Sequence, residues 1–181
     1  MRGAELPDLL ACRRLGRARC WLARASGRRP AQYKGPRIHL GDKYVVSTYS
    51  YRLIKSSWGI AIDITAEAAP LSDYSGAAAE EVEQGLWLEV ETSWQLSPDE
   101  CRYLATGLRL VSQDMQRRIA QDGPIVVRVI DLRFNPTDYQ EEGLAFALAG
   151  WMAQTFDFPF SPPHALFNRE KNRYEFSLPH T

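Results

Sequence analysis

The residues that most constrain the fold are the start and stop signals of one helix. Ser97 can cap its first turn, Pro98 suits the first helical position, and Glu100 can complete a capping box. Gly123 and Pro124 supply a stop, because glycine adopts the left-handed conformation and proline cannot continue a helix. Between these signals, apolar residues recur at helical spacing, namely Cys101, Leu104, Leu108, Val111, Met115 and Ile119. The sequence therefore predicts a helix with one buried stripe.

Alternating apolar and polar residues predict strands before that helix. Residues 42–68 contain two runs rich in Tyr, Val, Ile and Thr, separated by the turn-forming residues 55–57, which favours a hairpin. In the second run Ile60, Ile62 and Ile64 point to one face, which is typical of a half-buried strand.

A third strand is expected within residues 86–94, where Leu86 and Leu88 alternate with Trp87 and Glu89. The residues before it, 70–85, are small and polar, and they predict a loop of about 16 residues.

The remaining elements follow the helix. The apolar run 125–134 predicts a strand at the centre of the sheet. Asp138, three residues before Glu141, predicts the capped start of a second helix. Its expected buried side consists of Leu144, Leu148, Trp151 and Met152. Residues 165–178 resemble a small hairpin.

This order predicts an α+β fold, a two-layer sandwich with a β-β-β-α-β-α core and a C-terminal hairpin. The helices would cover the isoleucine face and leave the face with Glu89 and Glu91 open. We expect a basic, disordered extension at 1–37, an α+β domain at 38–160, and a C-terminal extension or hairpin at 161–181.

The charge is distributed unevenly. Residues 1–37 contain ten Lys or Arg residues and two Asp or Glu residues. The whole chain has 22 Lys or Arg and 22 Asp or Glu, so the other 144 residues contain 12 basic and 20 acidic residues. An organellar transit peptide, an arm that binds polyanions and an extension without a selected role all fit the basic segment. The acidic remainder argues against a nucleic-acid surface on the folded part.

The few cysteines and the lack of catalytic sequence motifs favour a cytoplasmic, non-catalytic protein. Cys12, Cys20 and Cys101 are too few for a disulfide framework or a paired zinc site, and Cys101 falls at a core position. No apolar run is long enough to cross a membrane. Neither a phosphate loop nor an HExxH motif occurs, so we expect no catalytic residues, metal or cofactor.

Residues 94–153 carry a family resemblance. A strand leads through a proline-containing helix start, a Gly-Pro turn, an apolar strand and a polar loop into an apolar helix. This order and spacing resemble domain IV of elongation factor G, which has the ribosomal protein S5 domain 2-like fold. The resemblance covers about residues 50–156. It implies that residues 55–59 and 135–139 form two tip loops at one end of the sheet.

The resemblance also has limits. In the family these loops reach into the ribosomal decoding region, and the second contains histidine. Here neither loop contains histidine or a basic cluster, and the GTPase phosphate loop is absent. The resemblance therefore implies the fold and not translocation activity.

Two candidate binding surfaces follow. The tip-loop candidates are Ser57, Trp58, Asn135, Asp138 and Tyr139. The acidic sheet-face candidates are Asp63, Glu89 and Glu91. Local packing of the two aromatic residues, and neutralisation of the acids by Arg52 or Arg128, are the structural alternatives.

We expect a protein partner at one of these surfaces. The first alternative is a ribosome-associated or RNA-binding protein that uses its basic extension, and salt-dependent binding would distinguish it. The second is an enzyme in which residues 70–85 act as a lid.

Overall fold

A computed structural model of the chain describes residues 45–54, 58–76, 78–91 and 95–177. They belong to one compact unit, Pro36–Thr181, which includes the C-terminal hairpin. The expected extension at residues 1–37 lies outside the described residues.

The larger sheet has five strands in the order β1-β2-β5-β4-β3. Neighbouring strands are antiparallel except β4 and β5, which are parallel. The strands are β1 (Val45–Ile54), β2 (Gly59–Pro70), β3 (Glu80–Glu83), β4 (Leu86–Val90) and β5 (Ile125–Phe134). The continuously apolar strand β5 is central, as its sequence predicts.

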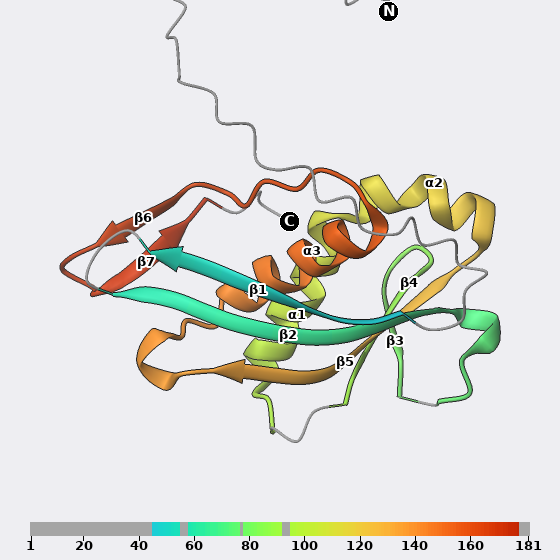
Figure 1. The fold of residues 1–181 in the computed structure, drawn as a ribbon, viewed down its shortest axis with the longest axis horizontal. Coiled ribbons are helices and arrows are strands. Elements are labelled where there is room, and N and C mark those ends of the chain that lie inside the picture. The colour runs from blue at the N-terminus through green and yellow to red at the C-terminus, as the bar shows by residue number, and fades with distance from the viewer. Residues whose placement is uncertain (1–44, 55–57, 77, 92–94, 178–181) are drawn as a thin grey trace, which may run out of the picture. The chain divides into compact units, whose positions relative to one another are not determined.

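Helices cover one side of this sheet (Figure 1). They are α1 (Pro98–Leu110), α2 (Ser112–Asp122) and α3 (Gly143–Phe156), with 3₁₀ turns η1 (Leu71–Asp73) and η2 (Pro136–Asp138). A separate antiparallel hairpin of β6 (Ala165–Asn168) and β7 (Arg173–Phe176) completes the described fold. The predicted two-layer α+β sandwich with a C-terminal hairpin is confirmed.

The core lies between the helices and the isoleucine face of the sheet. Ile60, Ile62 and Ile64 are fully buried, so the predicted covered face is correct. Helix α3 is buried on nearly its whole circumference, and Gln154 is its one exposed residue. The sequence predicts burial of one side only, through Leu144, Leu148, Trp151 and Met152, whereas α3 is packed on nearly all sides. None of the helices among the described residues is long and apolar enough to cross a membrane.

Helix α1 begins as predicted. The Ser97 side chain accepts a hydrogen bond from Glu100 N, and the Glu100 carboxylate accepts one from Ser97 N, which forms the complete capping box. The expected single helix is nevertheless two helices. Val111 leaves helical geometry, with φ −113° and ψ 5°, and its N–H bonds back to Leu108 O. The buried stripe continues through this break, and Gly123 ends α2 with φ 87°.

The predicted loop at residues 70–85 is wrong in part. Strand β2 continues to Pro70, and Glu80–Glu83 form the edge strand β3, which pairs with β4. This strand lacks apolar alternation because it has three glutamates, a composition that protects sheet edges from further pairing. Gly85, with φ 77°, forms the tight turn into β4. The described part of the third predicted strand ends at Val90, and residues 92–94 lie outside the described residues.

The second helix starts later than predicted. Asp138 does not cap it but ends η2, and α3 begins at Gly143. The polar segment forms a 3₁₀ turn instead, because the Asn135 side chain accepts a hydrogen bond of 3.1 Å from Thr137 N.

Candidate functional site

Trp58, a described residue of the first predicted tip loop, lies at the same end of the sheet as the second predicted loop, residues 135–139. Trp58 stands immediately before β2, and its Nε1 donates a hydrogen bond to Thr137 O in η2, 79 residues away in sequence. This contact supports the placement that the resemblance implies. Ser57 lies outside the described residues.

The C-terminal hairpin adds a third segment to this end. The Trp58 ring stacks on Tyr174 of β7 at 5.4 Å between centroids, and it also contacts Phe167 of β6. Tyr174 donates a 2.8 Å hydrogen bond from its hydroxyl to Trp58 O. We call Trp58, residues 135–140 and the β6–β7 hairpin the tip. The sequence shows the aromatic residues of the hairpin but not where they pack.

Tyr139 is held from two sides. Its ring stacks on Phe134 at 4.0 Å between centroids, and its hydroxyl donates a 2.5 Å hydrogen bond to Glu100 Oε1. Burial and this hydrogen bond raise the pKa of Tyr139. Burial also acts to raise the pKa of Glu100, but the bonds from Tyr139 and Ser97 lower it overall. The second loop is thereby tied to the start of α1.

Tyr139→Phe is expected to destabilise the protein by about 1 kcal/mol at neutral pH, since a half-exposed hydrogen bond to a carboxylate is lost. The folded protein lowers the pKa of Glu100. The ionised Glu100 carboxylate therefore stabilises the fold above its unfolded pKa, and this stabilisation disappears as pH falls through its folded pKa. The difference between variant and wild type should therefore shrink in acid. Urea unfolding at neutral and acidic pH measures it, with Tyr103→Phe on α1 as the control. A pH-independent difference would contradict this assignment.

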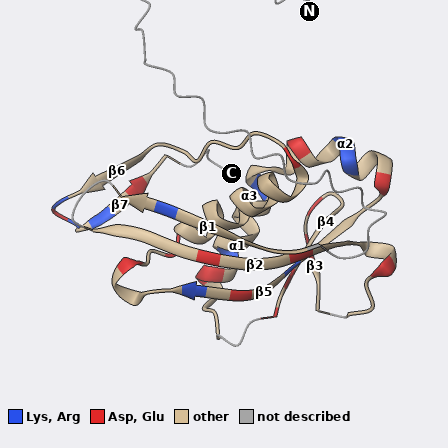
Figure 2. Cartoon of the chain, viewed as in Figure 1, with Lys and Arg blue, Asp and Glu red and all other residues tan. Residues whose placement is uncertain are grey.

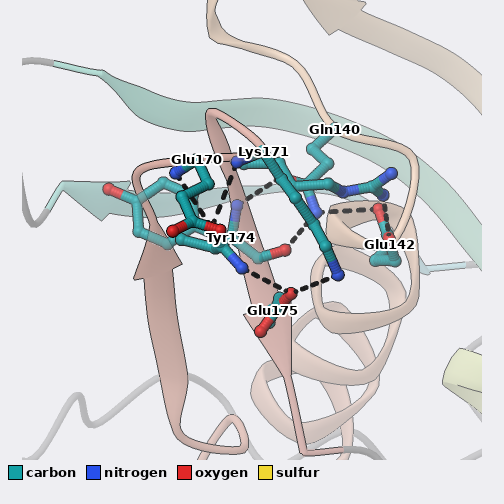
Figure 3. Close-up of polar contacts among 8 residues, drawn as sticks. Gln140, Glu142, Glu170, Lys171, Tyr174 and Glu175 are labelled. Atoms are coloured by element: carbon teal, nitrogen blue, oxygen red, sulfur yellow. Dashed lines mark hydrogen bonds and ion pairs between the residues drawn. The ribbon is translucent and has the colours of Figure 1, made fainter.

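Gln140 fixes the hairpin with its side-chain amide (Figure 3). Its Oε1 accepts a 2.9 Å hydrogen bond from Tyr174 N, and its Nε2 donates one of 2.8 Å to Tyr174 O. One side chain thus pairs with β7 as a neighbouring strand would. Nε2 also donates to Glu142, which in turn pairs with Arg173. Both Gln140 and Tyr174 are buried.

The outer surface of the tip is polar with one large apolar residue. Asn135 and Thr137 are exposed, whereas Asp138 and Tyr139 are half-buried. Leu166 of β6 is 62% exposed, while its neighbour Phe167 packs against the core. The hairpin turn carries Arg169, Glu170 and Lys171, all exposed and of mixed charge.

Acidic and basic residues lie on neighbouring strands of the sheet (Figure 2), and the three candidate acids pair with arginines. Asp63 accepts hydrogen bonds from Ser50 at 2.6 Å and from Arg52 at 2.5 Å. The Ser50 bond, together with Arg52, holds the pKa of Asp63 below its usual value against the opposing effect of burial. Asp63 also lies opposite Arg133 of β5 in the strand register.

Arg128 of β5 neutralises the other half of this face. Its guanidinium lies 3.0 Å from Glu67 and 3.2 Å from Glu89, and it also contacts Glu91. Glu89 and Glu67 are its direct cross-strand neighbours on β4 and β2. The three candidate acids therefore occupy two arginine-centred clusters, with Asp63 in one and Glu89 and Glu91 in the other. The structure favours neutralisation over a free carboxylate patch.

The groups that could support chemistry are dispersed. Among the described residues, no three His, Cys, Asp or Glu side chains are grouped to hold a metal ion. His164 is exposed, and burial raises the pKa of the half-buried Cys101 thiol. The latter effect reduces thiolate nucleophilicity at neutral pH.

Comparisons with known proteins identify no family. No protein-family model and no curated protein matches the chain. Among solved structures, it is similar to the protein ttk003000868 from Thermus thermophilus, with a TM-score of 0.39 and 13% sequence identity. The match covers 59% of this chain and 14% of that protein.

Proposed function

We propose that this chain is a non-catalytic module that binds another protein through its tip. The observation that carries the proposal is the convergence of three distant segments on one hydrogen-bonded end, through Trp58, Gln140 and Tyr174. A surface whose loops are already fixed loses less conformational entropy when it binds. The resemblance to domain IV of elongation factor G supports the same end of the sheet.

A protein partner is favoured over RNA at the tip. The exposed turn carries both signs of charge, with Arg169 and Lys171 beside Glu170. Protein surfaces that bind nucleic acids depend on clustered Lys and Arg residues, whereas protein–protein interfaces combine apolar anchors with a polar rim. Leu166 supplies the exposed apolar group. The proposal includes a cytoplasmic location, which rests on the small number of cysteines.

The open sheet face is the weaker surface for this function. Asp63, Glu89 and Glu91 would have to exchange their arginine partners for those of another protein. This exchange costs free energy before any gain from binding.

The test is affinity capture with the tip changed only on its outer surface. Trp58→Ala is unsuitable because the packed indole also supports the fold. We expect Leu166→Asp to abolish recovery of the partner that wild type captures, while Gln113→Asp on the exposed surface of α2 preserves it. Direct binding of the captured protein to purified wild type, but not to Leu166→Asp, completes the test.

Equal recovery by both variants would contradict the tip assignment. Binding that is lost with residues 1–37, falls steeply with salt and is sensitive to nuclease would instead support the RNA-binding alternative.

A further inference from the structure

Strand β1 is a long edge strand of the five-stranded sheet. It spans Val45–Ile54 and pairs with β2 through ten successive residue pairs without a bulge. Among the described residues, no other strand pairs with it. The backbone N–H and C=O groups on its outer side are thus arranged to accept another strand.

The two edges of the sheet differ in how they are protected. Strand β3, at the opposite edge, has four residues, three of them glutamate, and an irregular register. These are features that prevent edge pairing. Strand β1 contains neither proline nor glycine, and its one charged residue, Arg52, is paired with Asp63. Only β1 of these two edges is suited to further pairing.

The exposed side chains of β1 form a symmetric pattern. Val46 is 56% exposed and Ile54 is 76% exposed, and both belong to the open face with Thr48, Ser50 and Arg52. Val46 and Ile54 stand four residues before and four residues after Ser50. A strand with apolar residues at equal distances from its centre is complementary to an antiparallel copy of itself.

We propose that β1 of one chain pairs antiparallel with β1 of a second copy, about a two-fold axis at Ser50. In this register Val46 of each copy lies opposite Ile54 of the other, so the Val46–Ile54 pair forms twice and covers the exposed apolar residues of both copies. On the core face, Tyr49 of each copy lies opposite Tyr51 of the other, which places two pairs of aromatic rings across the junction. The two sheets then continue as one.

Charge favours this register over its neighbours. With the axis at Ser50, Arg52 lies opposite Thr48, and the two arginines are four residues apart along the strands, roughly 13 Å. An axis at Arg52 would bring the two arginines directly together, which is unfavourable. An axis at Thr48 would place Val46 opposite Ser50 and leave Ile54 beyond the described end of the partner strand. The register at Ser50 alone matches Val46 with Ile54.

The first measurement is sedimentation equilibrium of the full chain over a range of concentrations. We expect a monomer–dimer equilibrium in wild type. The double variant Val46→Lys/Ile54→Lys should raise the dissociation constant at least about tenfold. Both positions are exposed, and circular dichroism checks that the fold is unchanged. A monomer at every concentration, or unchanged association of the double variant, would overturn the proposal.

Cysteine cross-linking tests the register itself. Under mild oxidation, Ser50→Cys should form a disulfide-linked dimer, because opposed residues in antiparallel strands lie within disulfide range. A mixture of Val46→Cys and Ile54→Cys chains should cross-link as well. Thr48→Cys should cross-link no more than wild type, which retains its three natural cysteines. The reason is that the two thiols introduced at position 48 would lie roughly 13 Å apart along the strands. Efficient cross-linking of Thr48→Cys alone would exclude the Ser50 axis.

Discussion

Trp151→Ala is expected to lower the free energy of unfolding by about 3–5 kcal/mol, the range for a large aromatic residue removed from a core. Trp151 is fully buried in α3, and its Nε1 donates a 3.0 Å hydrogen bond to Ser47 O of β1. The variant therefore loses apolar packing and leaves a strand carbonyl without this donor. The loss is a large fraction of the roughly 5–15 kcal/mol that holds a typical domain folded.

Urea unfolding measures this effect, and two variants divide it into parts. Trp151→Phe keeps most of the ring but not the donor, so it should lose less than Trp151→Ala. Trp87→Ala removes the same kind of side chain from the half-exposed side of β4 and should cost clearly less. Equal losses at Trp151 and Trp87 would contradict the central position of α3 in the core.

Most of the strands and the start of the first helix could be predicted because their signals are local. The alternation of Ile60, Ile62 and Ile64 is enough to predict the covered face of the sheet. The capping box of Ser97 and Glu100 is complete within four residues, so it can be recognised in the sequence. The central position of β5 follows from its continuous apolar run.

The errors have physical causes that local patterns do not reveal. Strand β3 is acidic because it lies at an edge, so it gives no alternation signal. The break at Val111 preserves the buried stripe, so helical spacing continues across it. Asp138 and Glu141 have the spacing of a helix cap. The Asn135 side chain instead accepts a hydrogen bond from Thr137 N, which starts the 3₁₀ turn η2 before the helix can begin.

The candidate site could be predicted only as a location. Trp58 and Tyr139 stand out in sequence as large aromatic residues in loops, and the resemblance predicts that their loops lie together. Their partners are distant: Tyr174 lies 116 residues from Trp58, and Glu100 lies 39 residues from Tyr139. Because such pairs form only in the folded chain, the sequence could not distinguish packed aromatic residues from exposed anchors.

Gln140→Leu is expected to release the C-terminal hairpin and destabilise the protein by about 2–4 kcal/mol, since the N–H and C=O of the buried Tyr174 both lose their hydrogen bond with the Gln140 amide. Leucine has a similar size, so loss of packing contributes little. The hairpin closes the tip over Trp58, and its release should expose the stacked Trp58 and Tyr174 rings.

Hydrogen exchange locates this effect. The Tyr174 amide should exchange much faster in Gln140→Leu, while the amides of the central strand β5 change only by the global loss of stability. Gln154→Leu, at the exposed position of α3, is the matched control and should leave Tyr174 protected. If Tyr174 remained protected in Gln140→Leu, the hairpin would be held by aromatic packing rather than by the amide. Partner capture by Gln140→Leu would then follow wild type, whereas a released hairpin should lose the partner along with Leu166→Asp.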